Sequence, residues 1–187
     1  MLTNGELEAK NRIFDCIKNN NPFLDLSYLS LNQIPIELEH ANHITELNLS
    51  NNNLFSINDV INKLDKLLFL DLSNNNLNEI RGLGFDFGNR LHLKSINLNG
   101  NLFNDIPCEL FGLNIFPEVT IENNPFEKNV PLEILEYGVE NIANYLEQVK
   151  MAESTVRLLE AKVIFLGRGD VGKTSLMKKI QYCPIKI

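Results

Sequence analysis

The feature that most constrains the fold of this chain is an apolar frame, L-x-L-x-x-N-x-L-x-x-I, that returns at nearly constant intervals. Its second apolar position recurs at Leu26, Leu49, Leu72, Leu98 and Ile121, in steps of 23, 23, 26 and 23 residues. A period of this length is typical of solenoids, in which each copy contributes one supersecondary unit. Because a single copy cannot bury its apolar edge, the five copies over residues 23–127 are expected to stack around one continuous core.

Each copy supplies the same apolar positions around one polar position. The five sets are Leu24, Leu26, Leu29, Leu31 and Ile34; Leu47, Leu49, Asn52, Leu54 and Ile57; Leu70, Leu72, Asn75, Leu77 and Ile80; Ile96, Leu98, Asn101, Phe103 and Ile106; and Val119, Ile121, Asn124 and Phe126. Since alternate residues of a strand point to opposite sides, each copy predicts a short strand with its leucines directed inward. The longer third step contains the glycine-rich residues 81–88, which we expect to bulge on the outer side.

This frame resembles that of the leucine-rich repeats. The resemblance implies an α/β fold, a right-handed solenoid with a parallel β-sheet. It also implies that Asn52, Asn75, Asn101 and Asn124 form an interior ladder, bonding to the backbone where each strand turns. An amide buried without such partners would be destabilising. The first copy has Leu29 at this position, so the ladder should begin with the second copy.

Both flanks of the repeats predict helical caps, because an open solenoid end would expose its core. Residues 1–22 contain an apolar helical face that includes Cys16, expected to pack as a small hydrophobe, with a reactive thiol as the alternative. Residues 128–157 contain a second helical pattern, opened by Pro131, and a polar connector. The expected cap-facing residues are Leu7, Ile13, Phe14 and Ile17 in the first cap, and Leu135, Val139, Ile142, Leu146 and Val149 in the second.

A second motif, G-x-x-x-x-G-K-[ST], occupies residues 167–174. The apolar residues 163–166 are expected to form a buried parallel strand before it, and residues 175–181 to begin an amphipathic helix after it. In that context backbone N–H groups and a helix N-terminus would surround a phosphate, and a bare glycine turn is the alternative. Lys173 would bridge the β- and γ-phosphates, and the Thr174 hydroxyl would bind Mg²⁺. The predicted nucleotide-binding residues are Gly167, Arg168, Gly169, Asp170, Val171, Gly172, Lys173, Thr174 and Ser175.

Charge is distributed unevenly along the 187 residues. Residues 150–187 carry eight Lys or Arg and three Asp or Glu, a net +5, so residues 1–149 carry −12 of the overall −7. An acidic first part argues against nucleic acid as its main partner. The three cysteines are far apart, which favours a reduced, cytoplasmic setting, and no apolar run approaches the roughly 20 residues of a membrane span.

The outward positions of the strands are predicted to form a concave surface for a partner. They are Asp25, Ser27, Tyr28, Glu46, Asn48, Ser50, Phe69, Asp71, Ser73, Ser95, Asn97, Asn99, Glu118, Thr120 and Glu122. Several are acidic and none is Lys or Arg, which favours a basic protein surface as partner, whereas a generic polar face is the alternative. We expect binding to depend on Asp25, Glu46, Asn48, Phe69, Asp71, Asn97 and Glu118. Phe69 is the outward aromatic residue among the well-formed strands, and aromatic residues are enriched at binding hot spots.

The order of repeats, helix and phosphate loop resembles that of the Roco proteins, large GTPases in which repeats precede a Ras-like (Roc) domain and a dimerising COR domain. The resemblance implies GTP or GDP and Mg²⁺ as ligands, and a protein partner or the GTPase domain itself on the repeats. Residues 158–187 would be the beginning of the Roc domain. No D-x-x-G or N-K-x-D follows the loop, so these residues are expected neither to hydrolyse GTP nor to be stable alone.

Three interpretations follow. The chain is the N-terminal part of a Roco-type GTPase, an acidic repeat adaptor with a vestigial loop, or part of an ATP-binding protein, since the loop itself does not select the base. Two other motif matches are interpreted as coincidental. N-K-L-D at residues 62–65 fits the return segment of a repeat through Leu64, and D-F-G at residues 86–88 has no accompanying kinase motif.

Overall fold

The computed structural model describes the backbone of residues 2–80, 93–107, 110 and 118–166, and the side chains of these residues as far as residue 152. Its contacts divide the chain into two units, Met1–Leu146 and Glu147–Ile187, and the first unit contains the five strands. The glycine-rich residues 81–88, the D-F-G match and the phosphate loop lie outside the described residues.

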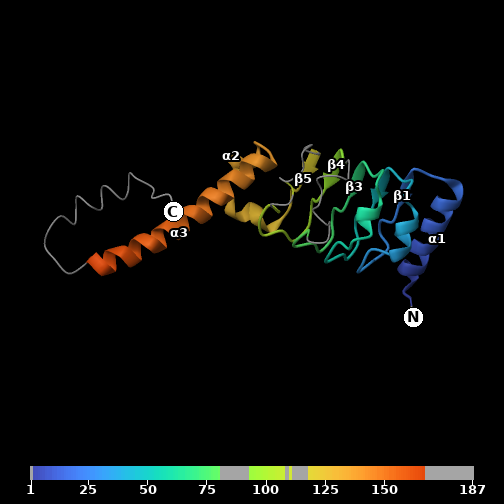
Figure 1. Ribbon diagram of the computed structural model, residues 1–187, viewed down its shortest axis with the longest axis horizontal. Coiled ribbons are helices and arrows are strands. Elements are labelled where there is room, and N and C mark those ends of the chain that lie inside the picture. Colours follow the sequence, from blue (N-terminus) through green and yellow to red (C-terminus); the bar gives the residue numbers. More distant parts are fainter. Residues whose placement is uncertain (1, 81–92, 108–109, 111–117, 167–187) are drawn as a thin grey trace. The chain divides into compact units, whose positions relative to one another are not determined.

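Five short strands stand side by side in chain order (Figure 1). They are β1 (Phe23–Asp25), β2 (Glu46–Asn48), β3 (Phe69–Asp71), β4 (Ser95–Asn97) and β5 (Glu118–Thr120). Every neighbouring pair is parallel, which requires a crossover after each strand. Two of these return segments contain the 3-10 helices η1 (Ile36–His40) and η2 (Ile61–Lys63). The predicted parallel sheet in a solenoid-like arrangement with helices is therefore confirmed.

The core follows the repeating frame. The middle residues of the five strands, Leu24, Leu47, Leu70, Ile96 and Val119, are aligned by the strand register. The residue two places later in each copy is buried in every case. Each such leucine or isoleucine contributes roughly 1.5–3 kcal/mol on burial. The core is continuous because every copy buries its apolar edge against the next.

The asparagine ladder is confirmed: Asn52, Asn75, Asn101 and Asn124 are all buried. The Asn75 side-chain oxygen accepts the Leu54 backbone N–H at 3.0 Å. Its amide nitrogen donates to the Leu49 carbonyl at 3.0 Å and the Leu72 carbonyl at 3.1 Å. The other three asparagines bond in the same way, so no amide in the ladder lacks partners.

The ladder also has a direction. Each asparagine satisfies backbone groups of the copy that precedes it, as Asn52 does for the N–H groups of Leu29 and Leu31. The first copy has no preceding copy to serve, and its ladder position is Leu29, which packs against the core. A ladder amide at this position would have no preceding copy to bind. A helix covers this end of the sheet instead.

One backbone position recurs in the left-handed region in every copy, and the first copy has a second such position at Ser30, with φ 54°. The residue directly before each ladder position has positive φ: 58° at Tyr28, 56° at Asn51, 53° at Asn74, 65° at Gly100 and 59° at Asn123. Asparagine and glycine adopt this conformation readily, whereas other side chains crowd the following carbonyl. Tyr28 is therefore the strained member of the series.

The N-terminal cap is α1 (Asn4–Asn19), which packs against β1. It begins with a capping box, because Thr3 accepts the Glu6 backbone N–H and the Glu6 carboxylate accepts that of Thr3. Its C-cap is Asn20, which has the left-handed conformation.

The predicted apolar face of α1 is mostly wrong. Its buried residues are Ala9, Ile13 and Cys16, so Ile13 and the inward position of Cys16 are confirmed. Leu7, Phe14 and Ile17 are 53%, 66% and 37% exposed. The physical reason is close packing: a Cβ at Gly5 would overlap the Leu29 carbonyl oxygen, so the helix approaches the first repeat along its small residues. The size of the side chains, and not their hydrophobicity alone, therefore decides which face of α1 packs against the first repeat.

The C-terminal cap consists of η4 (Pro125–Asn129), α2 (Leu132–Leu135) and the start of α3 (Val139–Leu166). The single helix predicted after Pro131 is interrupted at Gly138, whose φ is 84°. Of the predicted facing residues, Ile142 and Leu146 are buried and Leu135 and Val139 are half-buried against the core. Val149 is half-buried as well, and the interruption at Gly138 lies between Leu135 and Val139.

The strand predicted just before the phosphate loop is wrong, because residues 163–166 belong to α3. A short apolar run fits either a buried strand or a helix. A parallel strand needs a neighbouring strand for its backbone bonds, whereas a helix satisfies them internally. The described residues of the second unit contain no strand that could pair with it. None of the helices in the described ranges has the length and apolar character needed to span a membrane.

Candidate interaction face on the parallel strands

The outward side chains of the strands form aligned rows, because the strands are parallel and in register. The first row is Phe23, Glu46, Phe69, Ser95 and Glu118, and the second is Asp25, Asn48, Asp71, Asn97 and Thr120. These two rows bring together residues up to 97 positions apart in the sequence, but the outward position predicted for Ser27, Ser50 and Ser73 is wrong, because all three are buried. The third row of the predicted face, after the strands, consists of these three serines, Asn99 and Glu122.

The first row carries two exposed aromatic side chains on either side of a carboxylate. Phe23 is 44% exposed and Phe69 is 41% exposed, and Glu46 lies between them in register. Phe69 was predicted as an outward aromatic residue, whereas Phe23 was not. The signal for Phe23 is in the sequence, since F-L-D occurs at both residues 23–25 and 69–71.

The second row has a structural task as well as an outward position. The Asp25 side chain accepts the Ser27 backbone N–H at 2.9 Å, and Asp71 accepts that of Ser73 at 2.9 Å. Asn48 and Asn97 do the same for Ser50 and Asn99. These side chains hold the chain as each strand ends, in an Asx turn. Their orientation is therefore fixed before any partner arrives.

A shallow hollow of about 340 Å³ lies on this face. Its lining includes Phe23, Glu46, Phe69, Asp71, Ser95 and Asn97. Two aromatic residues and two carboxylates therefore share one open surface. The lining contains no Lys or Arg, and among the described residues the Glu46 carboxylate makes no hydrogen bond or ion pair.

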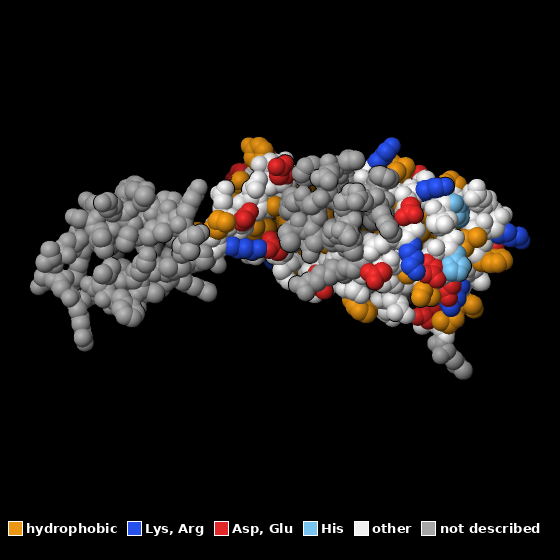
Figure 2. Space-filling view, viewed as in Figure 1, with side chains coloured by type: hydrophobic (Ala, Val, Ile, Leu, Met, Phe, Trp, Pro, Cys, Tyr) orange, Lys and Arg blue, Asp and Glu red, His pale blue; other side chains and the backbone are white. Residues whose placement is uncertain are grey.

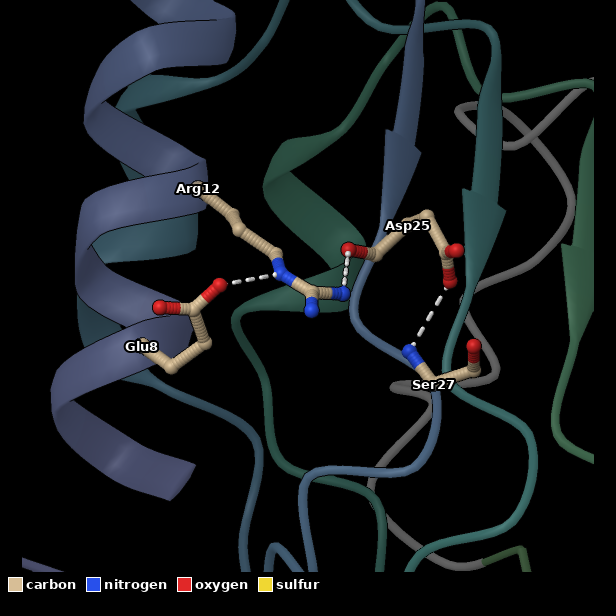
Figure 3. A network of polar contacts seen from close by, with 4 residues as sticks. All are labelled: Glu8, Arg12, Asp25 and Ser27. Atoms are coloured by element: carbon tan, nitrogen blue, oxygen red, sulfur yellow. Dashed lines mark hydrogen bonds and ion pairs between the residues drawn. The ribbon is translucent and has the colours of Figure 1, made fainter. Parts of the chain in front are cut away.

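One arginine approaches this face from the cap, and the sequence did not indicate it. Figure 3 shows Arg12 reaching from α1 toward β1. Its guanidinium donates to the Glu8 carboxylate at 2.9 Å and to the Asp25 backbone carbonyl at 3.2 Å. The Asp25 carboxylate remains bound to the Ser27 N–H. Arg12 therefore links α1 to β1, and its positive charge is paired with Glu8 on its own helix.

The opposite, return side of the repeats carries charges of both signs. Figure 2 shows acidic, basic and histidine side chains next to one another at the end of the molecule near α1. Lys10 pairs with Glu37 at 2.6 Å, and Lys63 pairs with Glu39. Hydrogen bonding to Lys10 lowers the pKa of Glu37, and hydrogen bonding to Lys63 lowers the pKa of Glu39. Glu37 and Glu39 are therefore compensated on this side, whereas Glu46 in the hollow has no ion pair among the described residues.

The Cys16 thiol behaves as a structural group. Its Sγ donates to the Asn21 carbonyl at 3.2 Å, and the His43 ring nitrogen lies 3.9 Å away. Burial raises the pKa of Cys16, which opposes formation of the reactive thiolate. In the described ranges, no three His, Cys, Asp or Glu side chains gather so as to hold a metal ion.

A second hollow, of about 550 Å³, opens where the last strand meets the C-terminal cap. Its apolar lining includes Ile121, Phe126, Leu132, Leu135 and Val139. It belongs to the junction between β5 and α2, away from the first-row aromatic residues.

The predicted nucleotide site, Gly167 to Ser175 with Thr174 as Mg²⁺ ligand, lies outside the described residues. The N-K-L-D match lies within them: Asn62 and Lys63 are in η2, and Leu64 is buried in the repeat core. Leu67 is buried as well. The interpretation of this match as part of a return segment is confirmed.

Neither the family models nor the curated proteins compared with this chain include a match.

Proposed function

We propose that the strand face of the repeats is a protein-recognition surface, and that it belongs to a Roco-type GTP-binding protein with its phosphate loop at residues 167–174. The observation that carries the first part is the row of Phe23, Glu46 and Phe69 on an open hollow. A solvent-exposed aromatic pair around a charge adds nothing to the core, and aromatic side chains are frequent binding anchors.

Two properties of the face favour binding. Its second row is held by hydrogen bonds at the end of each strand, so little conformational freedom is lost when a partner docks. Its strands carry Asp25, Glu46, Asp71 and Glu118 and no Lys or Arg. A partner with a basic surface would be attracted over a distance and oriented on approach.

The test is the selection of a random peptide library on the whole chain, repeated on two variants with the same change in charge. Glu46→Arg places a cation in the hollow, and Asp65→Arg places one on the exposed return side. We expect peptides that bind the chain and the Asp65→Arg variant but not the Glu46→Arg variant. Peptides that bind all three equally, or the absence of any enriched peptide, would contradict the proposal.

The nucleotide part of the proposal is supported by the sequence G-R-G-D-V-G-K-T. Titration of Mg²⁺-GTP and Mg²⁺-ATP into the chain tests it, with Lys173→Ala as the control. We expect weak binding that is lost in Lys173→Ala. A clear preference for ATP would favour the ATP-binding interpretation, and no binding of either nucleotide would favour a repeat adaptor with a vestigial loop.

A further inference from the structure

Resting on the proposed recognition face, we infer that the hollow binds an arginine side chain of the partner, stacked between Phe23 and Phe69 and paired with Glu46. The inference names the chemistry of the ligand, which the recognition face alone does not. It depends on three features of the hollow: the spacing of the aromatic rings, the position of the carboxylates, and the source of positive charge.

The spacing suits a flat cation. Phe23 and Phe69 lie on β1 and β3 at the same register position, with Glu46 on the strand between them. Neighbouring strands are about 4.8 Å apart, so the two aromatic residues are separated by about 10 Å along the sheet. Outward side chains on backbones at that separation leave a hollow between them, in which a planar group can lie next to the Glu46 carboxylate.

The carboxylates supply the charge. Glu46 lies at the centre of the row, and Asp71 lines the same hollow from β3. Asp71 uses one carboxylate oxygen for the Ser73 N–H. The other oxygen of Asp71 and the carboxylate of Glu46 are available to a donor from outside, as far as the described residues go.

The chain does not bring a cation of its own to this place within the described residues. Arg12 is the basic side chain that reaches β1, and its guanidinium is bound to Glu8 and to the Asp25 backbone. Figure 3 shows it on the helix side of the strand. On the return side, by contrast, Lys10 and Lys63 pair with glutamates. The hollow therefore has two carboxylates and no Lys or Arg in its lining, and a partner can supply the positive charge.

Arginine fits these features better than lysine. Its guanidinium is planar, stacks on aromatic faces and presents parallel N–H donors that match a carboxylate. The ammonium group of lysine is more strongly hydrated and has no flat face to stack. Cations within about 6 Å of an aromatic ring centre are attracted by its negative face, and two rings act together here.

The test uses peptides enriched on the whole chain from the random library. In each peptide, every arginine is replaced in turn by citrulline, which keeps the shape and removes the charge, and by lysine. We expect one arginine whose replacement by citrulline weakens binding at least about tenfold, with lysine also weaker than arginine.

Matched chain variants locate the contact. Glu46→Gln and Phe69→Leu should weaken binding of the arginine peptide at least about tenfold, whereas Asp65→Asn on the exposed return side should change it less than about twofold. Peptides that require Glu46 but tolerate citrulline or prefer lysine would overturn the arginine inference and leave the recognition face intact. Peptides that do not distinguish Glu46→Arg from Asp65→Arg would overturn both.

Discussion

The side-chain oxygen of Asn75 accepts the backbone N–H of Leu54, one repeat earlier, at 3.0 Å. The same side chain donates to the carbonyls of Leu49 and Leu72. One buried amide therefore joins two consecutive copies through their backbones, and it does so with both its donor and its acceptor.

Replacement of Asn75 by alanine is expected to lower the free energy of unfolding by about 2–4 kcal/mol, because buried backbone groups in two consecutive copies lose their partner. Urea unfolding followed by circular dichroism measures the change. Asn76→Ala, at the exposed neighbouring position, is the control and should stay within about 0.5 kcal/mol of the parent. Equal effects of the two substitutions would contradict the structural role of the ladder.

Gly5→Ala separates packing from helix propensity. Propensity alone predicts that alanine stabilises α1 by about 1 kcal/mol. The new methyl group would overlap the Leu29 carbonyl oxygen, so we expect a net loss of stability instead, of about 1–3 kcal/mol as for other overpacked sites. Asn11→Ala, on the exposed side of the same helix, should stabilise slightly. A higher melting temperature for Gly5→Ala would show that the cap does not approach the first repeat so closely.

Tyr28→Asn is expected to stabilise the fold by up to about 1 kcal/mol, because Tyr28 has φ 58° and asparagine adopts this conformation more easily. Tyr28 is 76% exposed, so little packing is lost. Phe55→Asn exchanges another exposed aromatic residue, one that is not among those with positive φ, and should bring no gain. An equal increase in the denaturation midpoint for both substitutions would contradict the strain assigned to Tyr28.

The Lys10–Glu37 pair predicts a small pH dependence. The pKa of Glu37 is lowered in the folded chain, so its contribution is present above the ordinary glutamate pKa of about 4.3 and is lost as pH falls through the lower folded-state value. Lys10→Met should reduce stability at neutral pH by less than about 1 kcal/mol, since both side chains are partly exposed.

The difference in the free energy of unfolding between Lys10→Met and the parent should therefore become smaller as the solution is acidified. Carbon NMR of the Glu37 carboxyl should show a higher pKa in the variant than in the parent. A gap in stability that widens at low pH would contradict this pairing.

The sheet and its ladder could be predicted from the sequence because one short rule sets both. Leu47 and Leu70 fall at the same point of the frame, so their strands pair in register, and the one polar position inside the frame has to find backbone partners. Because the frame occurs five times, the structure predicted for one copy could be compared with that predicted for the others.

The caps and the second unit occur once each, so no other copy supports their prediction. The inward face of α1 depends on how closely Gly5 and Ala9 let the helix approach, a three-dimensional fit that the apolar pattern does not contain. Residues 163–166 are apolar in either a strand or a helix, and only the presence of strand partners could decide between them. Within the interaction face, Phe23 could have been predicted from the F-L-D that residues 23–25 share with residues 69–71.

The one-way bonding of the asparagine ladder makes the two ends of the repeat stack unequal under mechanical load. Loss of the fifth copy takes Asn124 away from Phe103 and Leu98, which stay behind in the fourth copy with unsatisfied backbone groups. Loss of the first copy instead leaves Asn52 as the group without its outer partners, and a side chain can turn toward water more easily than a strand can. Tension applied to the fifth copy should therefore propagate inward, each detached copy weakening its neighbour, while tension applied to the first copy should be borne by α1 and β1.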